Sequence, residues 1–136
     1  MPKAPLPPEL EQFLEQPRPA VVATIRADGS PVTTPTWYEW TAGRVLLSMD
    51  ATGRRVANLR RDPRVALTVL ADSWYSHVSL LGRVVELRAD PDLVDVDRLS
   101  MRYEGRPYEQ RNFEGVTALI EVERWHTYGE PASVGA

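Results

Sequence analysis

The pattern of apolar and polar residues along the first half of the chain predicts short antiparallel strands. Residues 20–26 (AVVATIR) are rich in β-branched side chains, which favour strands. An Asp28-Gly29 turn signal follows, and residues 32–40 are expected to pair back as a second strand that contains Pro35. Residues 45–49 form the third predicted strand after another glycine-containing turn. Connections this short predict an antiparallel meander.

Three more strands are predicted in the second half. Residues 65–70 (VALTVL) carry little polar content, which indicates a strand that is buried on both faces. A long strand is expected over residues 74–88, but its apolar positions change from even to odd numbers along its length. A β-bulge near Gly82 accounts for this change, because one extra residue reverses the face that points inward. Residues 116–128 form the last predicted strand.

Two or three short helices separate these strands. Pro8 is suited to the first position of one helix, and Asp50 or Thr52 to the cap of a second helix that stops at residues 62–63. A third helix is expected to open at residues 90–91, an Asp-Pro pair. The apolar residues that should face inward are Leu10, Phe13 and Leu14, then Val56 and Leu59, then Leu93, Val96, Leu99 and Tyr103.

These elements predict one mainly β domain of the α+β class. Six strands in a chain of 136 residues have few ways to cover their edges, and closure into a barrel is the simplest. The expected fold is therefore a six-stranded antiparallel barrel that spans residues 1–136, with residues 1–9 as an N-terminal tail. The chain has no cysteine, so disulfides and thiol chemistry are excluded.

Composition narrows the functional classes. The formal net charge is −3, which argues against nucleic-acid binding. No apolar run approaches the roughly 18 residues of a membrane span, and no signal peptide opens the chain, so a soluble cytoplasmic protein is expected. His77 and His126 are too isolated to suggest a metal site. No nucleophile–base or acid–base pair is evident and no catalytic residue is assigned, so an enzyme of this kind would take its chemistry from a cofactor.

Residues 48–59 (SMDATGRRVANL) are the first candidate for a binding site. A predicted strand end, hydroxyl groups, a glycine and two arginines meet there at the start of a helix. The first turn of a helix has free N–H donors and a partial positive charge, and guanidinium groups beside it favour a phosphate. The alternative interpretation is a capped surface helix whose arginines are solvated.

The second predicted strand is a candidate for contact with a flat ligand. Strand alternation places its residues on two faces: Thr33, Pro35 and Trp37 on one, and Thr34, Thr36, Tyr38 and Trp40 on the other. One face must therefore carry rings and hydroxyls outside the core, which suits a planar heterocycle. The alternative is that these aromatic residues belong to the core or to a protein interface.

The chain resembles the pyridoxamine-phosphate-oxidase-like split β-barrel flavin-binding proteins, in particular the branch of small deazaflavin-dependent reductases. The resemblance covers about residues 10–128. It is carried by VATIRADGSP at 22–31, PTWY at 35–38, LS at 47–48, RR at 54–55, ANLRRDPRV at 57–65 and the strand around Gly82. The pyridoxal-phosphate signature that longer relatives carry near their C-terminus is missing, which argues against vitamin B6 chemistry.

This resemblance implies a homodimer with two cofactor sites at the subunit interface. The cofactor phosphate would lie near the residues that match in position, which are Ser48, Thr52, Arg54, Arg55 and Asn58. The ring system would lie against the second strand, at Thr34, Pro35, Thr36 and Trp37, and Trp74 to His77 of the partner subunit would approach it.

The resemblance also implies an activity. The expected protein is an F420H2-dependent reductase that transfers a hydride from coenzyme F420 to a small unsaturated organic substrate. Arg54, Arg60 or Arg61 could serve as partners for the acidic tail of F420. One alternative is an FMN-binding oxidoreductase of the same fold. Another is a non-catalytic module that binds a flavin or a tetrapyrrole.

Overall fold

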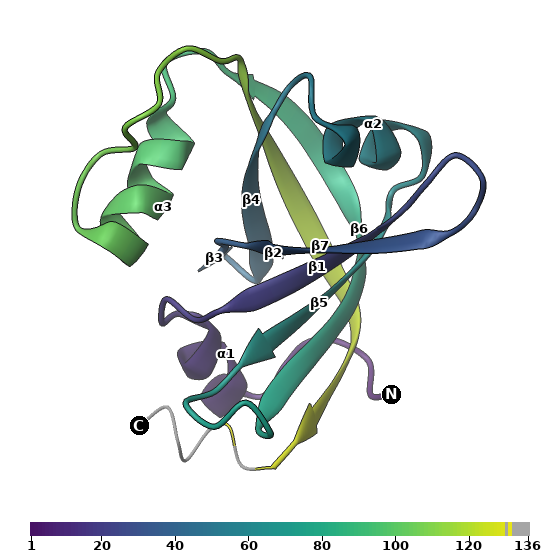
Figure 1. Ribbon diagram of the computed structural model, residues 1–136. Helices are drawn as coiled ribbons and strands as arrows, with labels where there is room; N and C mark the ends of the chain where they lie inside the picture. Colours follow the sequence, from purple (N-terminus) through teal and green to yellow (C-terminus); the bar gives the residue numbers. More distant parts are fainter. Residues whose placement is uncertain (130, 132–136) are drawn as a thin grey trace.

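The chain folds around one curved antiparallel sheet (Figure 1), in a computed structural model that describes residues 1–129 and 131. The strand order is β2-β1-β5-β6-β7-β4-β3, so β2 and β3 are the edge strands. The strands are β1 (Ala20–Ile25), β2 (Pro31–Thr36), β3 (Glu39–Thr41), β4 (Arg44–Asp50), β5 (Arg64–Leu70), β6 (His77–Asp90) and β7 (Gly115–Tyr128). The helices are α1 (Pro8–Leu14), α2 (Arg54–Arg61) and α3 (Val94–Glu104).

The sheet has seven strands rather than the predicted six because the second predicted strand is broken. β2 ends at Thr36 and β3 begins at Glu39. Between them Tyr38 is fully buried, and its hydroxyl donates to the carbonyl oxygens of Leu14 (2.9 Å) and Gln16 (3.0 Å). These contacts pull the chain out of its strand path. Tyr38 and Trp40 therefore belong to the core and do not share an exposed face with Thr34 and Thr36, which corrects the predicted alternation.

The long antiparallel pair β6–β7 is irregular at the predicted place and at a second place. At Gly82 the extra residue is Glu123 of β7, whereas the extra residue in β6 is Val85, between Val84 and Glu86. The inward face of β6 therefore reverses at Val85, a few residues later than predicted. A side chain at position 82 would collide with the carbonyl of Glu121, so only glycine fits there. The strand begins at His77 rather than at Trp74, because Trp74 and its neighbour lie in the preceding turn.

Burial in β5 also differs from the prediction. Val65, Leu67 and Val69 are buried, whereas the residues between them are half-buried. The strand lies between β1 and β6, and only its inner face contacts the core. The near-continuous apolar run therefore reflects one buried and one partly covered face.

The N-terminal segment is part of the fold. α1 covers the predicted residues and buries Leu10, Phe13 and Leu14. The preceding segment, expected to be a tail, places Leu6 in the core and pairs Lys3 with Arg124 of β7. Among the described residues, no helix is long and apolar enough to cross a bilayer.

The helix starts differ in detail from the predicted caps. Gly53 is the N-cap of α2, and no side chain caps it. The Asp50 carboxylate instead accepts hydrogen bonds from the backbone N–H (2.9 Å) and hydroxyl (2.8 Å) of Thr52. At α3, the Asp90 carboxylate accepts hydrogen bonds from the backbone N–H groups of residues 94 and 95, as expected of a capping residue. The helix itself begins at Val94, three residues later than residue 91.

Candidate functional site

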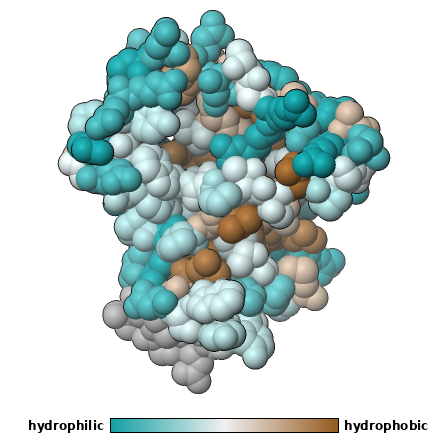
Figure 2. Space-filling model, in the orientation of Figure 1, coloured by the Kyte–Doolittle hydropathy of each residue, from teal (hydrophilic) through white to brown (hydrophobic). Residues whose placement is uncertain are grey.

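A cavity of about 680 Å³ opens between α2, α3 and the end of β2. This volume lies within the range that is usual for small-molecule and cofactor sites, roughly 300–1,000 Å³. Figure 2 shows the surface hollowed there, with hydrophobic residues at the floor and hydrophilic residues around the rim. The lining residues are Pro17, Pro19, Ala20, Pro35, Thr36, Trp37, Ser48, Arg55, Val96, Leu99, Tyr103 and Tyr108.

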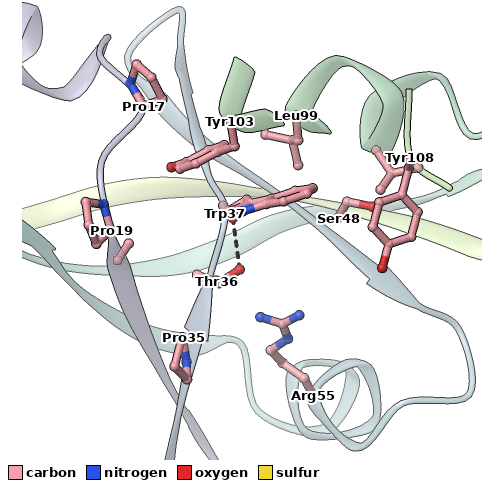
Figure 3. A pocket seen from close by; sticks show the side chains of 12 residues that line it. Pro17, Pro19, Pro35, Thr36, Trp37, Ser48, Arg55, Leu99, Tyr103 and Tyr108 are labelled. Atoms are coloured by element: carbon pink, nitrogen blue, oxygen red, sulfur yellow. Dashed lines mark hydrogen bonds between the residues drawn. The ribbon is translucent and has the colours of Figure 1, made fainter. Parts of the chain in front are cut away.

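Arg55 is the one charged residue in this lining. Its guanidinium points from α2 into the cavity (Figure 3), while Val56 and Leu59 of the same helix are buried in the core. The Nη1 atom is buried and has no hydrogen-bond partner among the described residues. Burial lowers the pKa of Arg55 from its ordinary value, because removal from water disfavours the charged form. A guanidinium in this state favours an anionic ligand.

The backbone at the start of α2 adds to the positive character of this wall. The helix begins after Gly53 with no side chain on its first N–H groups and no acidic residue in its first turn. Such a helix start carries free donors and a partial positive charge. Together with Arg55, it can hold a phosphate or carboxylate at the edge of the cavity.

Aromatic rings form the opposite wall. The indole of Trp37 stacks on Tyr103, with ring centroids 5.4 Å apart and planes 10° apart. Tyr108 meets the same indole edge-on at 6.0 Å. The Tyr103 hydroxyl donates to the carbonyl oxygen of Arg18 at 2.7 Å, and burial raises the pKa of Tyr103. This wall can pack against a flat, apolar ligand.

Five of the predicted site residues meet at this cavity: Pro35, Thr36, Trp37, Ser48 and Arg55. They come from the β2 end, the segment after it, β4 and α2. The Thr36 hydroxyl donates to the carbonyl oxygen of Trp37 at 2.9 Å and so fixes the turn that carries the indole.

Four other predicted residues near α2 and β2 lie outside the lining. Thr34 is exposed on edge strand β2, Thr52 is bonded to Asp50, and Arg54 is exposed. Asn58 is buried, and its amide donates to the Thr24 hydroxyl (3.1 Å) and accepts from Arg61 (2.9 Å). Its amide is thus occupied by contacts within the chain.

The two predicted residues of the fifth predicted strand lie apart from this cavity. Trp74 is 70% exposed in the β5–β6 turn, and its ring contacts that of Tyr75 at 5.0 Å. His77 begins β6, stacked against Tyr128 at 5.9 Å and edge-on to His126 at 6.0 Å. The structure of one chain therefore does not bring these residues to Arg55.

The part of the site formed by α3 and the loop after it was not predicted from the sequence. Val96, Leu99 and Tyr103 were expected to face inward, but as core residues rather than as a cavity wall. Tyr108 lies in a polar loop for which no role was predicted. The available signal was the pair of tyrosines on either side of residues 105–107, a helix-ending Gly-Arg-Pro sequence.

Comparison with known proteins gives a consistent result. Residues 6–129 match the family described as pyridoxamine 5'-phosphate oxidase. A solved F420 reductase superposes with a TM-score of 0.80 at 24% identity, covering 89% of this chain and 98% of that one. A conserved hypothetical protein from Mycobacterium tuberculosis gives 0.74 at 24%, covering 96% and 89%. General Stress Protein 26 from Bacillus anthracis gives 0.67 at 16%, covering 88% and 91%. At these identities the likeness shows a shared fold.

Proposed function

We propose that this chain, which belongs to the pyridoxamine 5'-phosphate oxidase-like split-barrel family, is an F420H2-dependent reductase that acts on a small unsaturated organic substrate. The observation that carries the proposal is the Arg55 guanidinium. It lies at a ligand-sized cavity with a buried Nη1 that has no partner among the described residues. An anionic group of a bound cofactor would supply that partner.

The residues present fit a phosphate-bearing tricyclic cofactor. Arg55 and the uncapped start of α2 would hold the phosphate, and Ser48 adds a hydroxyl to the same cavity. Pro35 and Trp37 offer a flat apolar surface for the ring, while the apolar residues of α3 exclude water. When bound there, a deazaflavin would supply the hydride, and the protein would supply binding and orientation. The similarity to the F420 reductase favours F420 over FMN, which also carries a phosphate.

The proposed assembly is a homodimer with cofactor sites at the interface. Trp74 and Tyr75 are 70% and 67% exposed, and their rings form an apolar pair at the tip of the β5–β6 turn. Large exposed apolar side chains that lie together are typical of interaction sites. In a dimer this pair and His77 would approach the cofactor that is bound to the partner chain.

Titration of the purified protein with F420 and, separately, with FMN tests the proposal. We expect binding of F420, and a loss of affinity of about 10- to 150-fold in Arg55→Ala, the usual scale for a charged hydrogen-bonded contact. The matched control is Arg44→Ala. It removes an exposed arginine at the first residue of β4, which does not line the cavity, and should leave the affinity unchanged. Binding of FMN without binding of F420 would favour an FMN oxidoreductase.

Turnover decides between an enzyme and a binding module. Oxidation of F420H2 is to be followed spectroscopically with a panel of enones, quinones and tetrapyrroles. We expect at least one of them to be reduced above the background rate. Tight cofactor binding without any turnover would instead favour a module that stores or protects its ligand.

A further inference from the structure

Three tyrosines surround the aromatic wall, and they use their hydroxyls differently. The hydroxyl of Tyr38 donates to two backbone carbonyls, and that of Tyr103 donates to the carbonyl of Arg18. The Tyr108 hydroxyl has no hydrogen-bond partner within the part of the chain that the structure describes. Two of the three hydroxyls therefore stabilise the fold, and the third is left for another partner.

The position of Tyr108 is fixed by contacts that do not involve this hydroxyl. The Asp97 carboxylate of α3 accepts a hydrogen bond from the Tyr108 backbone N–H (3.1 Å) and another from Arg111 (2.6 Å). Arg111 also donates to the Tyr108 carbonyl oxygen at 3.2 Å. The ring packs edge-on against Trp37 and Phe113. Backbone and ring are both held, so the hydroxyl is presented at a defined place.

That place is inside the cavity. Figure 3 shows the Tyr108 hydroxyl directed into the space that the Arg55 guanidinium enters from α2. One face of the Trp37 indole packs on Tyr103, and its other face is turned toward the cavity. A flat substrate in this cavity would have a neutral hydroxyl donor near its edge, distinct from the charged donor that would bind the cofactor phosphate.

We infer that Tyr108 is a substrate-contacting residue, that its hydroxyl donates a hydrogen bond to the carbonyl oxygen of a flat conjugated carbonyl compound, and that Asp97 is its positioning residue. This inference rests on the proposed function. A hydride from F420H2, which would be oxidised to F420, would add to the β carbon of such a compound, break the C=C π bond and leave an enolate, which a proton from water would complete at the α carbon. The negative charge of the enolate lies on the carbonyl oxygen, and a positioned donor at that oxygen stabilises it. The substrate class is thus narrowed from unsaturated compounds to conjugated carbonyl compounds.

The test uses two ligands of nearly the same shape and the protein loaded with oxidised F420, which cannot reduce them. Acetophenone carries the carbonyl oxygen, and α-methylstyrene has a methylene group in its place. Calorimetry is expected to show tighter binding of acetophenone to the unmodified protein. Tyr108→Phe should weaken acetophenone binding by about 2- to 10-fold, the scale of one hydrogen bond, and leave α-methylstyrene unchanged. Tyr128→Phe makes the same chemical change at an exposed residue and should change neither affinity.

Asp97→Ala tests the positioning role. The variant should lose the preference for acetophenone although the Tyr108 hydroxyl is intact, and hydrogen exchange of residues 106–113 should accelerate. Arg111→Ala, which removes the other half of the clamp, should give the same result in weaker form. Tyr108→Phe should leave the exchange of this loop unchanged, which separates contact from positioning.

The outcomes separate this inference from the proposed function. If the protein binds F420 but the two ligands bind equally, or if Tyr108→Phe weakens both to the same extent, the assignment of Tyr108 is overturned and the proposed function stands. If F420 does not bind, the proposed function and the inference fall together. If Asp97→Ala accelerates exchange but keeps the preference for acetophenone, the positioning role of Asp97 is overturned.

Discussion

Two charged side chains with buried polar atoms, Arg55 on α2 and Asp95 on α3, differ in how their charge is matched. On α3, the Asp95 carboxylate accepts from the Thr117 hydroxyl at 2.6 Å and forms ion pairs with Arg88 at 3.1 Å and Arg98 at 3.2 Å. On α2, the Arg55 guanidinium keeps a buried Nη1 with no partner in the described chain. The Asp95 carboxylate thus has its hydrogen-bond and ion-pair partners within one protein molecule. The buried Nη1 of Arg55 has none among the described residues.

This difference separates structural from functional burial. A buried polar group with its partners contributes to stability or is nearly neutral, whereas one without them costs free energy of folding. Such a cost persists at positions where a ligand later supplies the partner. We therefore assign the Asp95 cluster to the stability of the fold and Arg55 to the binding of an anion.

The largest expected effect is the loss of the matched cluster. Asp95→Ala removes three contacts and leaves the fully buried Thr117 hydroxyl without an acceptor, so the free energy of unfolding should fall by about 2–4 kcal/mol. Urea denaturation measures this change in the free energy of unfolding. Asp92→Ala, at an exposed aspartate just before the helix, should change stability by less than about 0.5 kcal/mol. Equal stability of the two variants would show that the cluster is not structural.

The α2 side could be predicted from the sequence because its signals are local. A helix start, a glycine and two adjacent arginines lie within a few residues, and helical geometry separates their directions: Arg54 is exposed and Arg55 enters the cavity. The strand segment with Pro35 and Trp37 was found for the same reason. Most strands also followed from local alternation and turn residues. The change of face within β6 was predicted as well, but it occurs at Val85 rather than at Gly82.

The features that were missed depend on contacts between distant segments. The break after Thr36 is caused by the burial of Tyr38 against the end of α1, more than twenty residues earlier in the chain. The wall formed by Tyr103 and Tyr108 depends on α3 packing beside a turn near residue 37. Asn58 was assigned to the ligand from its place in a motif, but α2 turns its amide toward Thr24 in β1. No short-range pattern encodes these pairings.

A smaller effect of opposite sign is expected on the α2 side. Arg55→Met keeps the length and apolar stem of the side chain but removes a half-buried charge whose buried Nη1 has no partner among the described residues. Without ligand, the free energy of unfolding should therefore rise by about 1 kcal/mol. Arg54→Met, the exposed neighbour, should change it by less than about 0.5 kcal/mol. Saturating F420 should then stabilise the unmodified protein more than Arg55→Met. A destabilised Arg55→Met variant would show that Arg55 has a partner in solution. The difference between the unmatched charge on α2 and the matched charge on α3 would then not hold.

The smallest expected effect is a change with pH that separates the two sides. Burial raises the pKa of Asp95, but the hydrogen bonds from Thr117 and Arg88, together with the positive charges of Arg88 and Arg98, outweigh it and hold the pKa below its usual value. Because the folded pKa is the lower one, the carboxylate contributes stability above the unfolded value of about 3.9, and this contribution disappears as the pH falls through the folded pKa.

The variant for this prediction is Asp95→Asn, which keeps the shape of the side chain and cannot ionise. At pH 7 it should be less stable than the unmodified protein, and the gap should narrow as urea denaturation is repeated at pH 4 and below. Arg55→Met should instead run parallel to the unmodified protein over the same range, because arginine keeps its proton there. A gap for Asp95→Asn that stays constant down to pH 2 would mean that the charge of Asp95 adds nothing to stability. In that case only the hydrogen bonds, and not the ionic match, would distinguish the α3 side from the α2 side.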